Sequence, residues 1–378
     1  MKIAIAPDSY KESLTALQVA TEIEAGFREI FPCANYVKLP IADGGEGTVE
    51  ALVAATQGTI IRLMVTGPLG EPVNAFYGLS GDKRSVFIEM AAASGLQLVP
   101  PARRNPLITT SRGTGELILS ALNQGVRHII IGIGGSATND GGAGMIQALG
   151  GRLLNNQGEQ IAYGGGALSD LVRIDMSEFE HRIAGCHVEV ACDVSGPLTG
   201  PDGASLLFGS QKGASPEQVK WLENALGHYG KVIHRDLNIE VNSLRGAAAA
   251  GGMGAALYAF CQAELRPGAE LVTKALGLDT EVKDATLVIT GEGCIDSQTL
   301  QGKAPLAVVK VAKRFNKPVI AIAGSLTDAH IVHQYGLDAV YSVIYNITTL
   351  EDALNNAAKN VRLAARNIAA TLAIGQQF

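Results

Sequence analysis

Short apolar runs alternate with helical patterns at both ends of the chain. Between the runs, apolar residues recur at the three- and four-residue spacing of amphipathic helices, most clearly in a long stretch that begins near Thr349. This alternation predicts a parallel sheet with helices on both faces. The runs that have the length of buried strands are residues 2–6, 36–40, 286–290, 318–323 and 339–344.

The middle of the chain has a less regular pattern. Residues 60–66 and 73–79 flank a turn rich in Gly and Pro and predict a β-hairpin. Residues 107–122 predict a helix, and residues 128–133 predict a buried strand. We therefore expect an α/β fold with a second, inserted α/β domain. The expected division is residues 1–60 plus 280–378 for the outer domain and residues 61–279 for the inserted one.

Composition narrows the class of protein. A chain of 378 residues that is 47% hydrophobic can fill two buried cores. The net charge of −6 argues against a nucleic-acid partner, because no basic stripe is present to neutralise phosphates. Five cysteines without a CxxC pair indicate reduced thiols. No apolar run approaches 18 residues, so we expect a cytoplasmic protein without a membrane partner; no pattern here predicts an oligomeric state.

Two glycine- and carboxylate-rich stretches follow apolar runs directly. They are residues 134–142 and residues 291–298. Glycines at the end of a buried strand present backbone N–H groups to an anion. The carboxylates beside them can hold Mg²⁺, which in turn binds phosphate. The combination predicts phosphoryl transfer with Mg²⁺ as cofactor.

Polar residues that follow the apolar runs, in the loops after the expected strands, supply candidates for each part of such a reaction. In open α/β sheets, ligands bind beyond the carboxyl ends of the strands, where these loops are expected. For Mg²⁺ the candidates are Glu292 and Asp296, with Asp193 also possible. For the proton of the acceptor hydroxyl, Asp193 is the first candidate and Asp43 the second. Each loop could instead be a tight turn whose acidic residue caps the next helix.

Other residues are candidates for binding the negatively charged phosphates or the carboxylate of an acidic acceptor. A lysine taken at random is more often a solvated surface group than a ligand. Lys212 and Lys303 are better candidates because glycines lie beside them. The phosphate-binding candidates are Gly134, Gly135, Ser136, Thr138, Asn139, Gly291, Gly293 and Lys303. The substrate-binding candidates are Asp8, Ser9, Lys11, Arg112 and Lys212, of which Lys11 is also a candidate for catalysis.

Seven sequence blocks lie in order along the chain. They are APDSYKESLTA at 6–16, PIADGGEGT at 40–48, GIGGSATNDGGAGM at 132–145, ACDVSGPLTGPDGA at 191–204, FGSQKGA at 208–214, GAAAAGGMGAAL at 246–257 and TGEGCIDSQTLQGKAP at 290–305. Together they resemble bacterial glycerate kinases of the type I family over essentially the full chain. The resemblance implies ATP-dependent phosphorylation of D-glycerate to 2-phosphoglycerate, in glyoxylate or glucarate/galactarate breakdown. It also implies a flavodoxin-like domain built from both chain ends, an inserted α/β domain, and an active site between the two.

Other functions stay open at this point. A kinase could act on the 3-hydroxyl of glycerate or on another hydroxy acid, since a small shift in pose changes the product. A nicotinamide-dependent oxidoreductase could use the glycines of residues 132–137, with Glu159 as the acidic partner of the ribose. A non-catalytic sensor of sugar acids is a third alternative, which the density of carboxylates disfavours.

Overall fold

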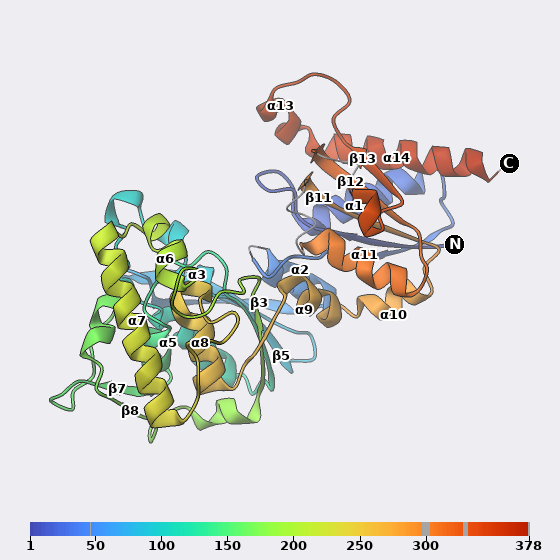
Figure 1. Ribbon diagram of the computed structural model, residues 1–378. Coiled ribbons are helices and arrows are strands. Elements are labelled where there is room, and N and C mark those ends of the chain that lie inside the picture. The colour runs from blue at the N-terminus through green and yellow to red at the C-terminus, as the bar shows by residue number, and fades with distance from the viewer. Residues whose placement is uncertain (46, 297–302, 328–331, 377–378) are drawn as a thin grey trace. The chain divides into compact units, whose positions relative to one another are not determined.

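The computed structural model describes residues 1–45, 47–296, 303–327 and 332–376. The chain forms two compact units (Figure 1). Unit 1 contains residues 1–43, 50–56 and 269–378, and unit 2 contains residues 44–49 and 57–268. None of the helices in the described ranges is both long and apolar enough to cross a membrane.

Unit 1 is built on a five-stranded parallel sheet in the order β13-β12-β11-β1-β2. Numbered within the unit, this order is 2-1-3-4-5, which is the flavodoxin-like arrangement. The strand order reverses between β1 and β11, where Ile3 pairs with Leu287 and Pro7 with Gly291. Ligands bind at such a switch point in open α/β sheets. The strands are β1 (Lys2–Pro7), β2 (Asn35–Lys38), β11 (Leu287–Ile295), β12 (Val319–Leu326) and β13 (Ala339–Ser342).

Helices cover both faces of this sheet, as the alternating pattern predicts. Ile3 and Ile5 of β1 pack with α1 and α14, whereas Ala4 and Ala6 face the core that includes α10 and α11. Helices with residues in unit 1 are α1 (Ala16–Arg28), α2 (Thr48–Ala55), α9 (Gly268–Ala275), α10 (Leu278–Lys283), α11 (Ala304–Arg314), α13 (Leu350–Asn355) and α14 (Ala357–Gly375), with a 3₁₀ turn at His333–Tyr335.

Helices α1 and α14 lie side by side at close range (Figure 1). The approach depends on Gly26, because a Cβ there would lie 2.3 Å from the carbonyl oxygen of Arg362. At the start of α1, the Thr15 side chain accepts from the backbone N–H of Gln18, and the Gln18 side chain returns the bond. This capping box satisfies two backbone N–H groups that the first turn of the helix leaves without partners.

Unit 2 contains a six-stranded mixed sheet in the order β10-β9-β6-β5-β4-β3. The first four strands are parallel, and β4 and β3 form the predicted antiparallel hairpin. A separate antiparallel pair is formed by β7 and β8. The strands are β3 (Thr59–Thr66), β4 (Pro72–Leu79), β5 (Ser85–Glu89), β6 (His128–Gly132), β7 (Arg152–Leu154), β8 (Arg173–Asp175), β9 (His187–Ala191) and β10 (Glu264–Arg266).

One large apolar core fills unit 2, between the sheet and its helices. Helix α8 becomes regular only at Met253, because Ala250 to Gly252 have positive φ. The helices are α3 (Ala91–Ser94), α4 (Arg112–Asn123), α5 (Ala143–Ala148), α6 (Ala204–Phe208), α7 (Pro216–Leu237) and α8 (Ala249–Cys261). The 3₁₀ turns are Leu96–Leu98, Pro101–Arg103, Gly165–Asp170, His181–Gly185 and Ser210–Lys212.

The second glycine-rich stretch is where the sequence prediction is wrong. Residues 291–295 are not a loop but the continuation of β11, and β12 likewise runs on to Leu326. The glycines are needed because the strands approach closely. A Cβ on Gly291 would lie 2.0 Å from the carbonyl oxygen of Ile322, and one on Gly324 would lie 2.4 Å from that of Gly293.

Two helix predictions also need correction. The helix expected over residues 107–122 begins at Arg112. The long C-terminal helix does begin after Thr349, but it is interrupted at Asn356, whose side chain donates to the carbonyl oxygen of Asp352 at 2.8 Å. A side chain that bonds to this carbonyl competes with the regular helical ladder.

Candidate active site

Three carboxylates gather at the switch point of the unit 1 sheet. Asp8 follows β1 directly, and its backbone N–H donates to the carbonyl oxygen of Gly291 at 2.8 Å. Glu292 lies in the adjacent strand β11 and is 7% exposed. Asp43 comes shortly after Ile41, whose N–H donates to Pro7 and extends the pairing of the β2 segment. The parallel sheet therefore brings together three acids that lie far apart in the sequence.

The three negative charges act on one another. Burial, the charge of Asp43 and then that of Glu292 together raise the pKa of Asp8 to about 7, against a hydrogen bond from the Ser9 N–H. The neighbouring Tyr10 hydroxyl has a raised pKa because it is buried and because Glu292 is near. Nearby like charges disfavour ionisation, so a cation would relieve the repulsion.

The carboxylates of Asp8, Asp43 and Glu292 suit Mg²⁺ as part of a ligand set that other groups complete. Among the described residues, these carboxylates do not form a group of three ligand atoms close enough to hold an ion unaided. Mg²⁺ rarely requires such a cage, because it is usually bound by one or two carboxylates together with substrate phosphates and water. The carboxylate oxygens of Asp8, Asp43 and Glu292, here called the acid cluster, suit that role. Asp296, the residue after β11, is a further oxygen donor.

Other predicted residues of unit 1 lie around this edge of the sheet. Lys11 is exposed in the turn after β1, and Lys303 precedes the first residue of α11. The predicted phosphate-binding role of Gly291 and Gly293 has no loop to support it, because both lie within β11. Residues 297–302 of the predicted loop lie outside the described residues.

The first glycine-rich stretch does form a loop, after β6 in unit 2. Gly134 and Gly135 are exposed, and Gly135 has the positive φ of +72° that glycine tolerates. The loop is fixed by two backbone bonds to its neighbours: Leu96 N–H donates to Gly135, and Ala137 N–H donates to Ser94. The loop can thus present its glycine backbone to an anion without reorganising.

The side chains further along this loop point into the interior. Thr138 and Asn139 are fully buried, and the Asn139 amide donates to Ser205 Oγ at 2.9 Å. Asp140 accepts bonds from the Ser111 N–H and hydroxyl at 2.9 and 2.8 Å, and from backbone N–H groups at the start of α5. The structure therefore separates the exposed glycines from buried residues that support the loop.

Lys212 is buried directly beneath the same loop. It is 3% exposed, and its Nζ donates to Ser136 Oγ and to the carbonyl oxygen of Thr138, both at 2.7 Å. Burial lowers the pKa of Lys212 to about 7, against the charge of Asp140, which raises it. Lys212, a predicted substrate-binding residue, thus bonds to Ser136 and anchors the loop from a buried position.

Two more predicted residues of unit 2 have structural partners. Asp193 is exposed, and its Oδ1 accepts from the N–H of Gly268, the first residue of α9, at 2.9 Å. Arg112 donates to Glu116 at 2.9 Å and lies over the ring of Tyr163. The carboxylate of Glu116 also accepts from Thr66, so Arg112 is tied into the packing of α4 against β3.

Sequence reasoning missed two supporting groups, Glu89 and Ser111. Glu89 ends β5, is 7% exposed, and accepts from the N–H of Val49 in the first turn of α2 at 2.9 Å. A carboxylate at the end of an apolar run is a signal that could have found Glu89. Ser111 lies 29 residues before its partner Asp140, and no local pattern marks it.

Comparisons with known proteins agree with one another over the whole chain. The model of the glycerate kinase family matches residues 3–373. The chain is 61% identical to glycerate 2-kinase from Escherichia coli K12 and 55% identical to glycerate kinase from Bacillus subtilis 168, covering 100% of this chain and 99% of each relative.

A solved structure gives the same result for the fold. The chain matches a crystal structure from Salmonella typhimurium LT2, designated glycerate kinase 2, with a TM-score of 0.94 and 66% identity over 100% of both chains. The family resemblance and the α/β fold predicted from the sequence are therefore confirmed. This chain belongs to the glycerate kinase family.

Proposed function

We propose that this protein transfers the terminal phosphoryl group of ATP to the 2-hydroxyl of D-glycerate and releases ADP and 2-phosphoglycerate. The observation that carries the proposal is the full-length identity of 61% to a protein named glycerate 2-kinase. The match of the family over residues 3–373 supports it. ATP and a small hydroxy acid are then the partners, and we infer a cytoplasmic reaction without nucleic acid or membrane.

We propose that Glu292, from the acid cluster of Asp8, Asp43 and Glu292, serves the metal–phosphate part of the reaction together with Asp296, whereas Asp8 and Ser9 remain predicted contacts of the substrate. Glu292 and Asp296 would hold Mg²⁺, which, when bound, neutralises charge on the ATP phosphates. Burial and the negative charges of Asp43 and Glu292 raise the pKa of Asp8, and this unfavourable environment for an anion supports a cation at this edge of the sheet. Glu292 suits the role because its strand fixes the backbone and its side chain is largely shielded from water.

The acceptor hydroxyl needs a group that takes its proton. We propose Asp193 for this role, with Asp43 as the second candidate. The bond from the Gly268 N–H holds one carboxylate oxygen of Asp193, so the carboxylate is oriented although its residue is exposed. An oriented carboxylate within reach of a hydroxyl is what general-base catalysis requires.

Anion binding by unit 2 is proposed for the exposed glycines of the loop after β6. Gly134 and Gly135 would offer backbone N–H groups, and Lys212 would hold Ser136 in place and add positive charge from below. Lys11, Arg112 and Lys303 remain predicted contacts of the substrate carboxylate or the phosphates. That the groups of unit 1 and unit 2 act on the same bound molecules also remains a prediction.

The oxidoreductase alternative has less support from the geometry. Glu159, its required acidic partner, lies in a tight turn after β7, where its N–H donates to the Asn155 side chain. It therefore does not follow a strand of the six-stranded sheet, as a residue that binds the ribose of a dinucleotide does.

An enolase-coupled assay tests the proposal. Purified protein is incubated with D-glycerate, ATP and Mg²⁺, and enolase converts any 2-phosphoglycerate to a product that absorbs in the ultraviolet. We expect a signal without phosphoglycerate mutase. A signal that requires the mutase would assign the 3-hydroxyl instead, and no ADP in either arm would refute a glycerate kinase.

Two variants test the roles in the same assay. Asp193→Asn should lower kcat by about 100-fold or more, because removal of a general base typically costs that much. Asp202→Asn, a nearby exposed aspartate, is the matched control and should leave kcat unchanged. An unchanged kcat in Asp193→Asn would remove Asp193 from the chemistry and turn attention to Asp43.

A further inference from the structure

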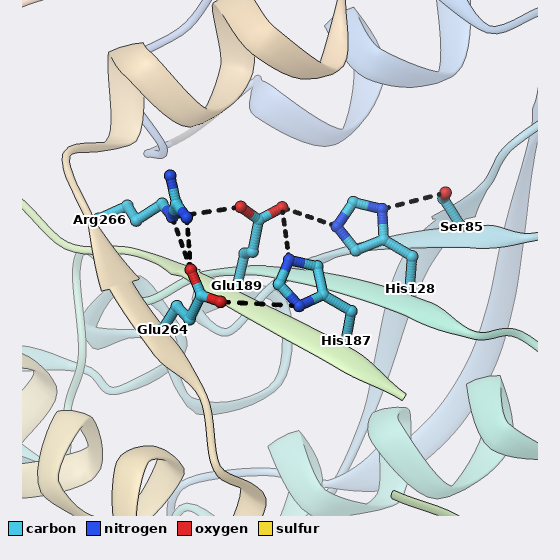
Figure 2. Close-up of polar contacts among 6 residues, drawn as sticks. All are labelled: Ser85, His128, His187, Glu189, Glu264 and Arg266. Carbon is cyan, nitrogen blue, oxygen red and sulfur yellow. Dashed lines mark hydrogen bonds and ion pairs between the residues drawn. The ribbon is translucent and has the colours of Figure 1, made fainter. Parts of the chain in front are cut away.

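Two histidines and a glutamate converge at the amino ends of the central strands of unit 2. His128 is the first residue of β6, and His187 is the first residue of β9. The register pairs His128 with His187, so the two side chains project from the same face of the sheet. Glu189, two residues along β9, projects from that face as well (Figure 2).

The three side chains direct one ligand atom each toward a common point. His128 Nε2 is hydrogen-bonded to Glu189 Oε2 at 2.8 Å, and His187 Nε2 lies 3.6 Å from the same oxygen. The three ligand atoms all lie within 4.8 Å of one another. A tetrahedral ion with bonds of about 2.0–2.1 Å separates its ligands by about 3.3 Å. The two distances to the carboxylate oxygen bracket that spacing.

The opposite ring nitrogens also have partners. Ser85 Oγ lies at the hydrogen-bond distance of 3.3 Å from His128 Nδ1, whereas Glu264 Oε1 lies at the ion-pair distance of 3.9 Å from His187 Nδ1 (Figure 2). When Ser85 Oγ accepts from His128 Nδ1, the Nε2 lone pair of His128 can bind a metal that replaces its hydrogen bond to Glu189. Histidines that bind metals almost always donate their other N–H in this way.

Arg266 orients the carboxylate of Glu189 from its far side. Its Nε lies 3.3 Å from Glu189 Oε1, and its guanidinium also bonds Glu264. The arginine thus engages one oxygen of Glu189, while the other oxygen faces both imidazoles (Figure 2). Glu189 thus has one oxygen held by Arg266 and the other directed at the position where an ion would bind.

His187 lies at ion-pair distance from the carboxylates of Glu189 and Glu264, at 3.6 and 3.9 Å, and beyond hydrogen-bond length in both cases. At 3.6 Å its Nε2 is too far from Glu189 Oε2 for a hydrogen bond, yet it points at that oxygen. The two imidazole rings are stacked, with centroids 5.3 Å apart and planes inclined by 24°. An ion between the two Nε2 atoms and the carboxylate would give both rings a common partner.

We propose that His128, His187 and Glu189 form a binding site for a divalent transition-metal ion such as Zn²⁺, with water as a further ligand. Two imidazoles and one carboxylate suit ions of this class, whereas Mg²⁺ prefers oxygen ligands alone. The His187 side chain is 48% exposed, so the ion has a path from solvent.

The site is independent of the proposed kinase function. It lies at the amino end of β6, whereas the glycine loop follows its carboxyl end at Gly132, four residues and about 13 Å along the strand. A bound ion would join β6 to β9 and, through Arg266 and Glu264, to β10, and would thereby stabilise unit 2.

Calorimetric titration with Zn²⁺ tests the proposal on full-length protein that has been stripped with a chelator and desalted. We expect one tight site in the wild type that Mg²⁺ neither fills nor blocks. His187→Gln should weaken Zn²⁺ binding by more than about 100-fold, and Ser85→Ala, which removes only the partner of His128, by about 10-fold. The exposed His181 provides the matched control, and His181→Gln should bind as the wild type does.

A second measurement separates ligand loss from misfolding. Zn²⁺ should raise the Tm of the wild type and of His181→Gln, because an ion that binds only the folded state stabilises it. It should leave the Tm of His187→Gln unchanged, with the circular dichroism of this variant matching the wild type. Equal Zn²⁺ affinity in the wild type and His187→Gln, or no site in the wild type, would overturn the proposal.

Discussion

Replacement of Lys212 by methionine should remove a pH dependence of stability that its buried ammonium causes. Burial lowers the pKa of Lys212 from 10.5 to about 7 in the folded chain. Between these two values the unfolded chain holds more protons at this position than the folded chain does. Stability therefore rises with pH over that range, because the ammonium group is costly to bury while it is charged.

The size of the effect follows from the two pKa values. The full cost of the buried charge, about 5 kcal/mol at 1.36 kcal/mol per pKa unit, applies below pH 7 and declines toward pH 10.5. Between pH 6.0 and pH 8.5 the contribution of Lys212 to the free energy of unfolding becomes more favourable by about 2 kcal/mol. Methionine is similar in length and has no proton to exchange, so the variant should lack this increment.

Urea unfolding at pH 6.0, 7.0 and 8.5 measures the increment. The chain has one tryptophan, Trp221 in α7, so its fluorescence reports on unit 2, which also contains Lys212. Lys220→Met, at an exposed position of the same helix, is the control and should keep the wild-type pH dependence. If Lys212→Met kept it as well, the buried ammonium would not be its source and the reasoning would be refuted.

Two further changes test the packing and the electrostatics of unit 1. Gly26→Ala should lower the free energy of unfolding by about 3 kcal/mol, since the new Cβ would lie 2.3 Å from the carbonyl oxygen of Arg362. Urea unfolding followed by circular dichroism checks this, and Gly375→Ala, which meets nothing within 4 Å, should be neutral. Glu292→Gln should lower the pKa of Asp8 in a metal-free NMR titration, because one neighbouring negative charge is gone; an unchanged pKa would contradict the coupling.

Much of unit 1 could be predicted from the sequence because its pattern is local. In β1, Ile3 and Ile5 alternate with Ala4 and Ala6, and each pair faces a different core, so the strand and its two covered faces can be read directly. The capping box at Thr15 is equally local. These elements depend on neighbours within a few residues.

The extension of β11 could not be predicted in the same way. Glycines usually mark turns, and the stretch that begins at Gly291 has the composition of a loop. Its strand conformation depends on pairing with β12, where Gly291 lies opposite Ile322. A contact between segments about 30 residues apart leaves no periodic signal in either one.

The acidic residues of the candidate site could be predicted from the sequence, whereas the contacts that hold its supporting residues in place could not. Asp8 and Glu292 follow or end apolar runs, and the parallel sheet then brings them to one edge. The burial of Lys212 depends on Thr138, which lies 74 residues earlier in the chain. His128 and Glu189 are 61 residues apart and match no metal motif, so only the register of β6 and β9 reveals them.

Proton-coupled phosphorus NMR of the reaction mixture tests the central claim most directly. The protein is incubated with D-glycerate, ATP and Mg²⁺, and the new phosphate ester is observed without a coupling enzyme. A phosphate on the 2-hydroxyl is attached to a carbon with one hydrogen, so the account predicts a doublet together with formation of ADP. A triplet would indicate the 3-hydroxyl, and the absence of any new ester would contradict the assignment of this chain as a glycerate kinase.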